Sequence, residues 1–79
     1  MDAIYDQLGT ILTASFDIDP GALRADASFE ELDLDSLAQV ELGELLGDRF
    51  GVAIDDDEFA RLSGISEVID LLREKGANG

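Results

Sequence analysis

Ser36 stands where an acidic loop meets an amphipathic stretch, and its hydroxyl is the first candidate for chemistry in this chain. Asp33 and Asp35 precede it, where carboxylates favour the positive end of a helix dipole. Ser36 and Gln39 have the spacing of a capping box, in which the serine oxygen accepts a hydrogen bond from a backbone amide of the first turn. On these residues alone, the pattern predicts that Ser36 is the N-cap of a helix.

The composition gives little support to other kinds of site. The 79 residues include no cysteine and no histidine, which excludes disulfide bonds, thiolate metal sites and Ser–His or Cys–His pairs. A calcium loop of the EF-hand type needs oxygen ligands at alternate positions and glycine at the sixth. A loop that starts at Asp17 has Ala22 at the sixth position, and one that starts at Asp33 has Leu37 at the fifth. We therefore expect no catalytic residue, no metal site and no enzymatic activity.

The charge of the chain limits its partners. Nineteen acidic residues face five basic ones, for a net charge of −14. Such a chain repels nucleic acids and anionic membranes, whereas it attracts proteins that have basic patches. Hydrophobic residues make up 46% of the sequence, enough for an apolar core, and no apolar run is long enough to span a bilayer. We expect one soluble, monomeric, cytoplasmic domain over residues 1–79, with a tail that frays at about residues 76–79.

Apolar residues at helical spacing predict three main helices, at residues 1–15, at residues 36–50 and from Ser63 onward. Asp2 favours the start of the first helix, and Ser63 is a candidate cap for the last. A short third helix is expected at about residues 56–62. Together these elements predict an all-α fold, a four-helix bundle with three main helices and a short third one. The predicted core positions on these helices are Ile4, Leu8, Ile11, Leu12, Leu42, Leu46, Phe50, Phe59, Leu62, Ile65, Val68, Ile69 and Leu72.

A long connection at residues 16–35 leads to Ser36. It contains a turn at Asp19-Pro20-Gly21 and a capping-box spacing between Ser28 and Glu31, which predicts one short helical turn. A structureless loop of this length is unusual in a compact domain, and its apolar residues indicate that it is pinned to the core. These apolar residues are Phe16, Ile18, Leu23, Phe29, Leu32 and Leu34.

The helix predicted at residues 36–50 has two different faces. One face is predicted to pack against the core, and Leu45 lies at the edge of this face. A cluster of carboxylates lies roughly opposite, with Leu37 and Val40 on or beside it. Two exposed aliphatic residues need no explanation, but an apolar centre ringed by carboxylates also suits a partner that has an apolar hollow and a basic rim. The carboxylates of this face are Glu41, Glu44 and Asp48.

Gly43 and Gly47 are unusual in the middle of a helix, because each costs up to about 1 kcal/mol relative to alanine. Their spacing places both on one side of the helix, near the direction of Ser36. They permit either the close approach of another element or space for a bound chain, and the sequence does not decide between these alternatives.

The order of these features resembles the acyl carrier protein family over nearly the whole chain. The Leu34-Asp35-Ser36-Leu37 motif matches the family's attachment site, and this resemblance implies that Ser36 carries a 4′-phosphopantetheine arm, which holds acyl groups as thioesters. It also implies that the arm is added by a phosphopantetheinyl transferase and that the second helix docks to partner enzymes. The residues expected to contact partners are Asp35, Leu37, Val40, Glu41, Glu44 and Asp48. Further matching segments are Asp19-Pro20, Phe29, Glu41-Leu42, Phe50-Gly51, Ile54 before an acidic run, and Val68-Ile69-Asp70-Leu71-Leu72.

The cargo follows less directly from the resemblance. Leu34 stands where the fatty-acid carriers usually have glycine, and Ala38 and Gln39 replace residues that are often more polar. The resemblance implies partners such as an acyltransferase, a ketosynthase or an acyl or aminoacyl ligase, each with a basic docking patch, in polyketide, fatty-acid or related biosynthesis. The alternatives are an aminoacyl or peptidyl carrier, and an unmodified acidic helical module that only binds proteins.

Overall fold

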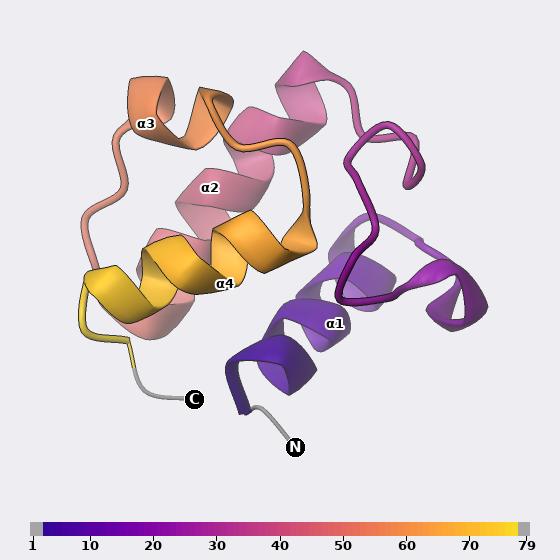
Figure 1. Cartoon of the computed structure of the whole chain (residues 1–79), viewed down its shortest axis with the longest axis horizontal. Coiled ribbons are helices and arrows are strands. Elements are labelled where there is room, and N and C mark those ends of the chain that lie inside the picture. Colours follow the sequence, from indigo (N-terminus) through magenta and orange to yellow (C-terminus); the bar gives the residue numbers. More distant parts are fainter. Residues whose placement is uncertain (1–2, 78–79) are drawn as a thin grey trace.

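The computed structural model describes residues 3–77, in which four α-helices surround a single apolar core (Figure 1). No β-strand occurs among these residues, and the one isolated β-bridge joins Ser28 to Gly64. The prediction of an all-α fold with a short third helix is therefore confirmed. The helices are α1 (Ala3–Ser15), α2 (Ser36–Phe50), α3 (Asp56–Ala60) and α4 (Ile65–Glu74), and a 3₁₀ turn, η1 (Pro20–Ala22), lies in the long connection.

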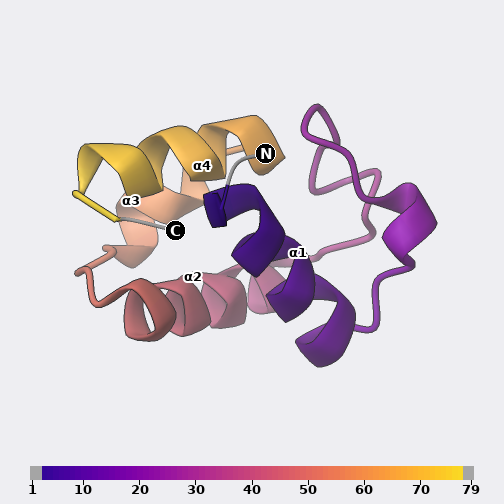
Figure 2. The same ribbon diagram turned by 90° about the horizontal axis from the view of Figure 1, so that it is seen from below.

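The helices bury the faces that their apolar spacing predicts. α1 contacts both α2 and α4, the two helices that lie beside it in Figure 2. Two predicted core positions are only half-buried, Phe50 and Leu62. Leu45, at the predicted edge of the core face, is 39% exposed. The buried helical residues are Ile4, Leu8, Ile11, Leu12, Leu42, Leu46, Phe59, Ile65, Val68, Ile69 and Leu72.

The long connection is pinned to the core, as its apolar residues predict. Ile18, Phe29, Leu32 and Leu34 are buried, and Phe16 and Leu23 pack against the same core. The Asp19 carboxylate accepts a hydrogen bond from the Gly21 amide, which caps η1. The Ser28 oxygen accepts one from the Glu31 amide at 3.0 Å, which forms the expected short turn. The connection thus reaches Ser36 along a fixed path.

The connection is also tied to the start of α4. The Phe29 amide donates to the Ser63 carbonyl, and the Ile65 amide donates to the Ala27 carbonyl, both at 2.9 Å. Gly64 lies between these bonds, and a Cβ atom there would come within 2.7 Å of the Ala27 oxygen. Only glycine therefore allows the two segments to approach this closely.

Several helix ends differ from the sequence prediction. α3 ends at Ala60 and does not reach Leu62. The N-cap of α4 is Gly64 and not Ser63, because both the amide and the hydroxyl of Ser63 donate to the Glu67 carboxylate. The expected cap at Asp2 lies outside the described residues.

The chain beyond α4 folds back onto the core. Gly76, at a φ of 87°, and Ala77 donate amide hydrogen bonds to the carbonyls of Arg73 and Leu72, and Ala77 is buried. Fraying was expected at about residues 76–79, but these two residues close the end of the helix. The remaining two residues of that tail, 78 and 79, lie outside the described part.

Two glutamates link the last elements and are expected to make folding sensitive to acid. The Asp55 amide and the Lys75 ammonium both donate to the Glu58 carboxylate, and these bonds lower the pKa of Glu58 below its ordinary value of 4.5. Hydrogen bonds from the hydroxyl and then the amide of Ser63 lower the pKa of Glu67 in the same way. A depressed folded pKa adds stability above the unfolded pKa, and this stability is lost as the pH falls through the folded value.

We therefore expect Glu58→Gln to narrow the difference between the free energies of unfolding at pH 7 and at acidic pH. Urea unfolding of the wild-type chain and the variant, each followed by circular dichroism from pH 7 down to pH 3, measures this difference. Loss of net negative charge on acidification acts on both chains, so the comparison isolates Glu58. The same pH dependence in both chains would contradict the stabilising role of this carboxylate.

Candidate functional site

The residue that caps the start of α2 is Asp35 and not Ser36. Asp35 has extended backbone angles, and its carboxylate accepts a hydrogen bond from the Ala38 amide at 2.8 Å, which makes it the N-cap. Ser36 is the first residue inside the helix. The Gln39 side-chain amide donates to the Leu34 carbonyl at 3.1 Å, so it does not complete a capping box with Ser36. The prediction of Ser36 as a cap is therefore wrong, because the neighbouring aspartate occupies that position.

This arrangement leaves the Ser36 side chain available. Ser36 is exposed, and its hydroxyl makes no hydrogen bond within residues 3–77. Leu34, two residues earlier, is buried and anchors the chain, and Asp33 turns the backbone with a φ of 61°. The first amides of a helix have no partner inside it, so the start of α2 also suits an anionic group attached nearby. The site can therefore present a nucleophilic oxygen to solvent on a rigid support.

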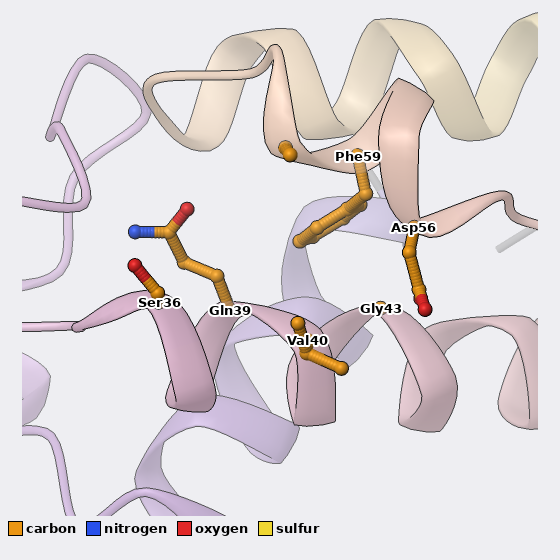
Figure 3. A pocket seen from close by; sticks show the side chains of 7 residues that line it. Ser36, Gln39, Val40, Gly43, Asp56 and Phe59 are labelled. Carbon is orange, nitrogen blue, oxygen red and sulfur yellow. The ribbon is translucent and has the colours of Figure 1, made fainter.

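A pocket of about 160 Å³ opens beside Ser36, between α2 and α3 (Figure 3). Figure 3 shows the Phe59 side chain reaching from α3 toward α2, on the same side of α2 as Gln39. Phe59 was expected from its spacing to lie in the core, and nothing in the sequence connected α3 with Ser36. The lining residues are Ser36, Gln39, Val40 and Gly43 of α2, and Asp56, Phe59 and Ala60 of α3.

The two glycines of α2 permit close approach of neighbouring segments. A Cβ atom at Gly43 would lie 3.3 Å from the ring of Phe59, so the absent side chain lets α3 sit against α2. A Cβ atom at Gly47 would lie 2.9 Å from the carbonyl oxygen of Val52, just after the helix. Gly43 also lines the pocket. At this position the missing side chain therefore both lets another element approach closely and leaves space beside the helix, the two alternatives left open by the sequence.

The outer side of α2 carries exposed aliphatic side chains among carboxylates. Leu37 is 68% exposed, and Val40 and Leu45 are each 39% exposed, so three large apolar side chains reach solvent on the same helix. The carboxylates on this side form no ion pair within the part of the chain that the structure describes. Leu45 was not among the residues expected to contact partners, because its helical position lies at the boundary of the core. We call this set the acidic face of α2: Leu37, Val40, Glu41, Glu44, Leu45 and Asp48.

Arg49 is the basic residue of α2, and it is held away from the start of the helix. Its guanidinium Nε donates to the Gln7 side chain of α1 at 3.2 Å. Arg49, Leu45 and Asp48 line a shallow groove between α1 and α2 together with Ile11 and Ser15. The positive charge therefore lies beside the acidic face, near α1, and forms no ion pair with its carboxylates among the described residues.

Neither a cluster of metal ligands nor a membrane-spanning helix occurs among residues 3–77. Among residues 3–77, no group of three or more acidic side chains is arranged to hold a metal ion. None of the described helices combines the length and the apolar character that crossing a membrane requires.

The chain matches a protein-family model described as a phosphopantetheine attachment site over residues 4–72. Among similar curated proteins, an acyl carrier protein of Thermosynechococcus vestitus is 36% identical over 75 residues, which is 94% of this chain and 93% of that protein. An acyl carrier protein of Petrotoga mobilis is 32% identical over 75 residues, with 94% of this chain and 88% of that protein covered.

Solved structures of acyl carrier proteins have a fold similar to that of this chain. The crystal structure of an acyl carrier protein from Thermotoga maritima superposes with a TM-score of 0.82 at 22% identity, over 91% of this chain and 85% of that chain. The solution structure of the 3,5-dioxohexyl carrier protein from the actinorhodin polyketide synthase of Streptomyces coelicolor superposes with a TM-score of 0.74 at 29% identity. That likeness covers 95% of this chain and 92% of the other.

Proposed function

Because the chain belongs to the acyl carrier protein family, we propose that Ser36 is the residue to which its 4′-phosphopantetheine arm is attached. The observation that carries this proposal is the exposed, unbonded hydroxyl of Ser36 at the first position of a 15-residue helix. The hydroxyls of Ser28 and Ser63 are instead hydrogen-bonded to glutamates. Ser36 therefore combines the motif, the exposure and a helix start that favours a phosphate group.

The residues around Ser36 fit a group that is attached by another protein. When bound, the arm supplies a flexible tether whose terminal thiol holds an acyl group as a thioester. The chain has no histidine and no cysteine, so it offers no usual base for activating the serine hydroxyl. A phosphopantetheinyl transferase must therefore supply that base. The chain contributes a fixed position, an accessible oxygen and backbone amides near the future phosphate.

The acidic face of α2 is the surface that we propose for docking to enzymes. Its exposed aliphatic residues lie next to Ser36 along the same helix, and its carboxylates form no ion pair with any other residue from 3 to 77. A partner with a small apolar hollow and a rim of arginine or lysine complements this face. Suitable partners are the phosphopantetheinyl transferase and an acyltransferase, ketosynthase or ligase that exchanges acyl groups with the arm. Asp35 adjoins this face and adds negative charge beside Ser36.

The relatives favour an acyl cargo over an aminoacyl or peptidyl one. The curated proteins that the chain resembles are acyl carrier proteins, and one solved neighbour, from a polyketide synthase, carries a 3,5-dioxohexyl group as a triketide mimic. We propose that the cargo is an intermediate of polyketide, fatty-acid or related biosynthesis.

Mass spectrometry tests the attachment directly. We expect the folded wild-type chain, incubated with coenzyme A, magnesium and a broad-specificity phosphopantetheinyl transferase, to gain the mass of one phosphopantetheine. Peptide fragmentation is expected to place the added mass on Ser36 and not on Ser28, Ser63 or the exposed Ser66. A gain on another serine would contradict the site, and no gain on a chain shown to be folded would favour an unmodified protein-binding module.

A further inference from the structure

The pocket beside Ser36 ends at a single aromatic side chain. Phe59 forms part of its lining and is only 2% exposed, because its other contacts lie inside the core. The large core residues Leu42 and Leu46 of α2, which are fully buried, do not line the pocket. The Phe59 ring therefore separates the pocket from the interior of the bundle.

The ring is held from two sides. Phe29, from the long connection, stacks on Phe59 with ring centroids 6.0 Å apart and an angle of 25° between the planes. On α2, the backbone at Gly43 leaves so little space that a Cβ atom there would lie 3.3 Å from the ring. Movement of Phe59 in either direction would displace a buried aromatic residue or the backbone of α2. Close packing of this kind resists opening, because interiors have few voids to accept a displaced ring.

The size of the pocket limits what it can shelter. Its volume is about 160 Å³. A protein cavity of about 150 Å³ accommodates benzene, a molecule of six carbon atoms. Val40, Phe59 and Ala60 provide apolar lining, whereas Gln39 and Asp56 add polar groups. A short acyl chain matches this space, and a long one would have to displace Phe59.

We infer that Phe59 is a plug that limits the acyl group sheltered by this chain to about six non-hydrogen atoms, and that Gly43 allows the plug to seat. This inference rests on the proposed attachment at Ser36, because the arm must bring the acyl group to the pocket. The residue acts on the length of the sheltered chain and not on the attachment itself. Longer acyl groups remain outside the bundle, where solvent and partner enzymes reach their thioesters.

Cleavage of the thioester by hydroxylamine measures this shelter, because a buried thioester reacts more slowly than an exposed one. The arm is first added to the wild-type chain and loaded with butyryl, hexanoyl, octanoyl or decanoyl groups, and intact mass confirms each loading. We expect several-fold slower cleavage of the butyryl and hexanoyl forms than of matching acyl-pantetheines free in solution. The octanoyl and decanoyl forms are expected to react at nearly the rate of the free compounds.

Variants at Phe59 test the role of the plug. Phe59→Ala replaces the ring by a single methyl group, and Phe59→Val replaces it by a smaller branched side chain, so both are expected to extend protection to octanoyl and decanoyl groups, the alanine variant further. Leu62→Ala is the matched control, because Leu62 is half-buried after α3 but does not line the pocket. This control is expected to protect the same acyl groups from hydroxylamine as the wild-type chain does. Circular dichroism checks the folding of each chain. If the alanine variant does not fold, the role of Phe59 is tested with the valine variant and with the wild-type chain loaded with the four acyl groups.

Several outcomes would overturn the inference. Protection of decanoyl as strong as that of hexanoyl in the wild-type chain would do so, as would equal cleavage of all four chain lengths. A folded Phe59→Val variant that protects only the acyl groups protected by the wild-type chain would show that the ring does not limit the length of the sheltered acyl group. A failure of the proposed function is seen earlier and separately, because a chain without the arm on Ser36 shows no gain in mass before loading.

Discussion

Ser36→Ala is expected to accept no phosphopantetheine and to keep the free energy of unfolding of the wild-type chain within about 0.5 kcal/mol. The hydroxyl makes no hydrogen bond within residues 3–77, and the side chain is exposed, so its removal leaves no buried group unpaired. The N-cap of α2 is Asp35, whose bond to the Ala38 amide remains in this variant. Intact mass after incubation with the transferase measures attachment, and urea unfolding measures stability.

Asp35→Ala is expected to give the opposite pattern. It removes the side-chain cap and should lower the free energy of unfolding by about 1 kcal/mol, the usual cost of a lost N-cap. The Ser36 hydroxyl stays in place, so this variant is still expected to gain the arm. The two variants together separate the structural role at the start of α2 from the chemical one.

A serine in a similar position elsewhere provides the control. Ser66 is exposed in the first turn of α4, and Ser66→Ala is expected to gain the arm as the wild-type chain does. Attachment to Ser36→Ala would rule out Ser36 as the site. A greater loss of stability in Ser36→Ala than in Asp35→Ala would contradict the assignment of the cap.

The helices and their buried faces could be predicted because apolar periodicity reports burial directly. The spacing of Ile65, Val68, Ile69 and Leu72, for example, leaves one face for the core, and all four are buried. The start of a helix is harder to predict to the residue. Asp35 and Ser36 are both favourable caps in adjacent positions, and the apolar pattern fits a helix that begins at either.

The pocket could not be predicted because it depends on residues that are distant in the sequence. The glycine at position 43 was compatible with either a close neighbour or space for a bound chain, and only the structure identifies Phe59 as the neighbour. The short α3 contacts α2, and the chain that follows α3 is tied to the long connection by the bridge between Ser28 and Gly64, which has no sequence signature. Leu45 was missed for a different reason, since a residue at the edge of an apolar face is buried or exposed according to how its neighbours pack.

Glu41→Lys is expected to slow the transfer of phosphopantetheine to the chain by about tenfold at low salt, mainly through slower association. Glu41 is an exposed carboxylate on the acidic face of α2, one turn from Leu37 and beside Val40. A lysine there would oppose a basic rim on the enzyme while leaving the core untouched. The measurement is kcat/KM of a phosphopantetheinyl transferase for the folded variant and the wild-type chain over a range of salt concentrations.

Glu74→Lys separates docking at this face from general attraction to an acidic protein. Glu74 is an exposed residue at the end of α4, and its substitution changes the net charge by the same amount as Glu41→Lys. Added salt should slow the wild-type reaction and reduce the difference between the variants, because exposed charges are screened beyond about 10 Å at 0.1 M salt. Equal slowing by both substitutions would mean that net charge alone governs the encounter. Rates independent of salt would exclude an electrostatic docking face, whereas slowing confined to Glu41→Lys places the contact on α2 beside Ser36.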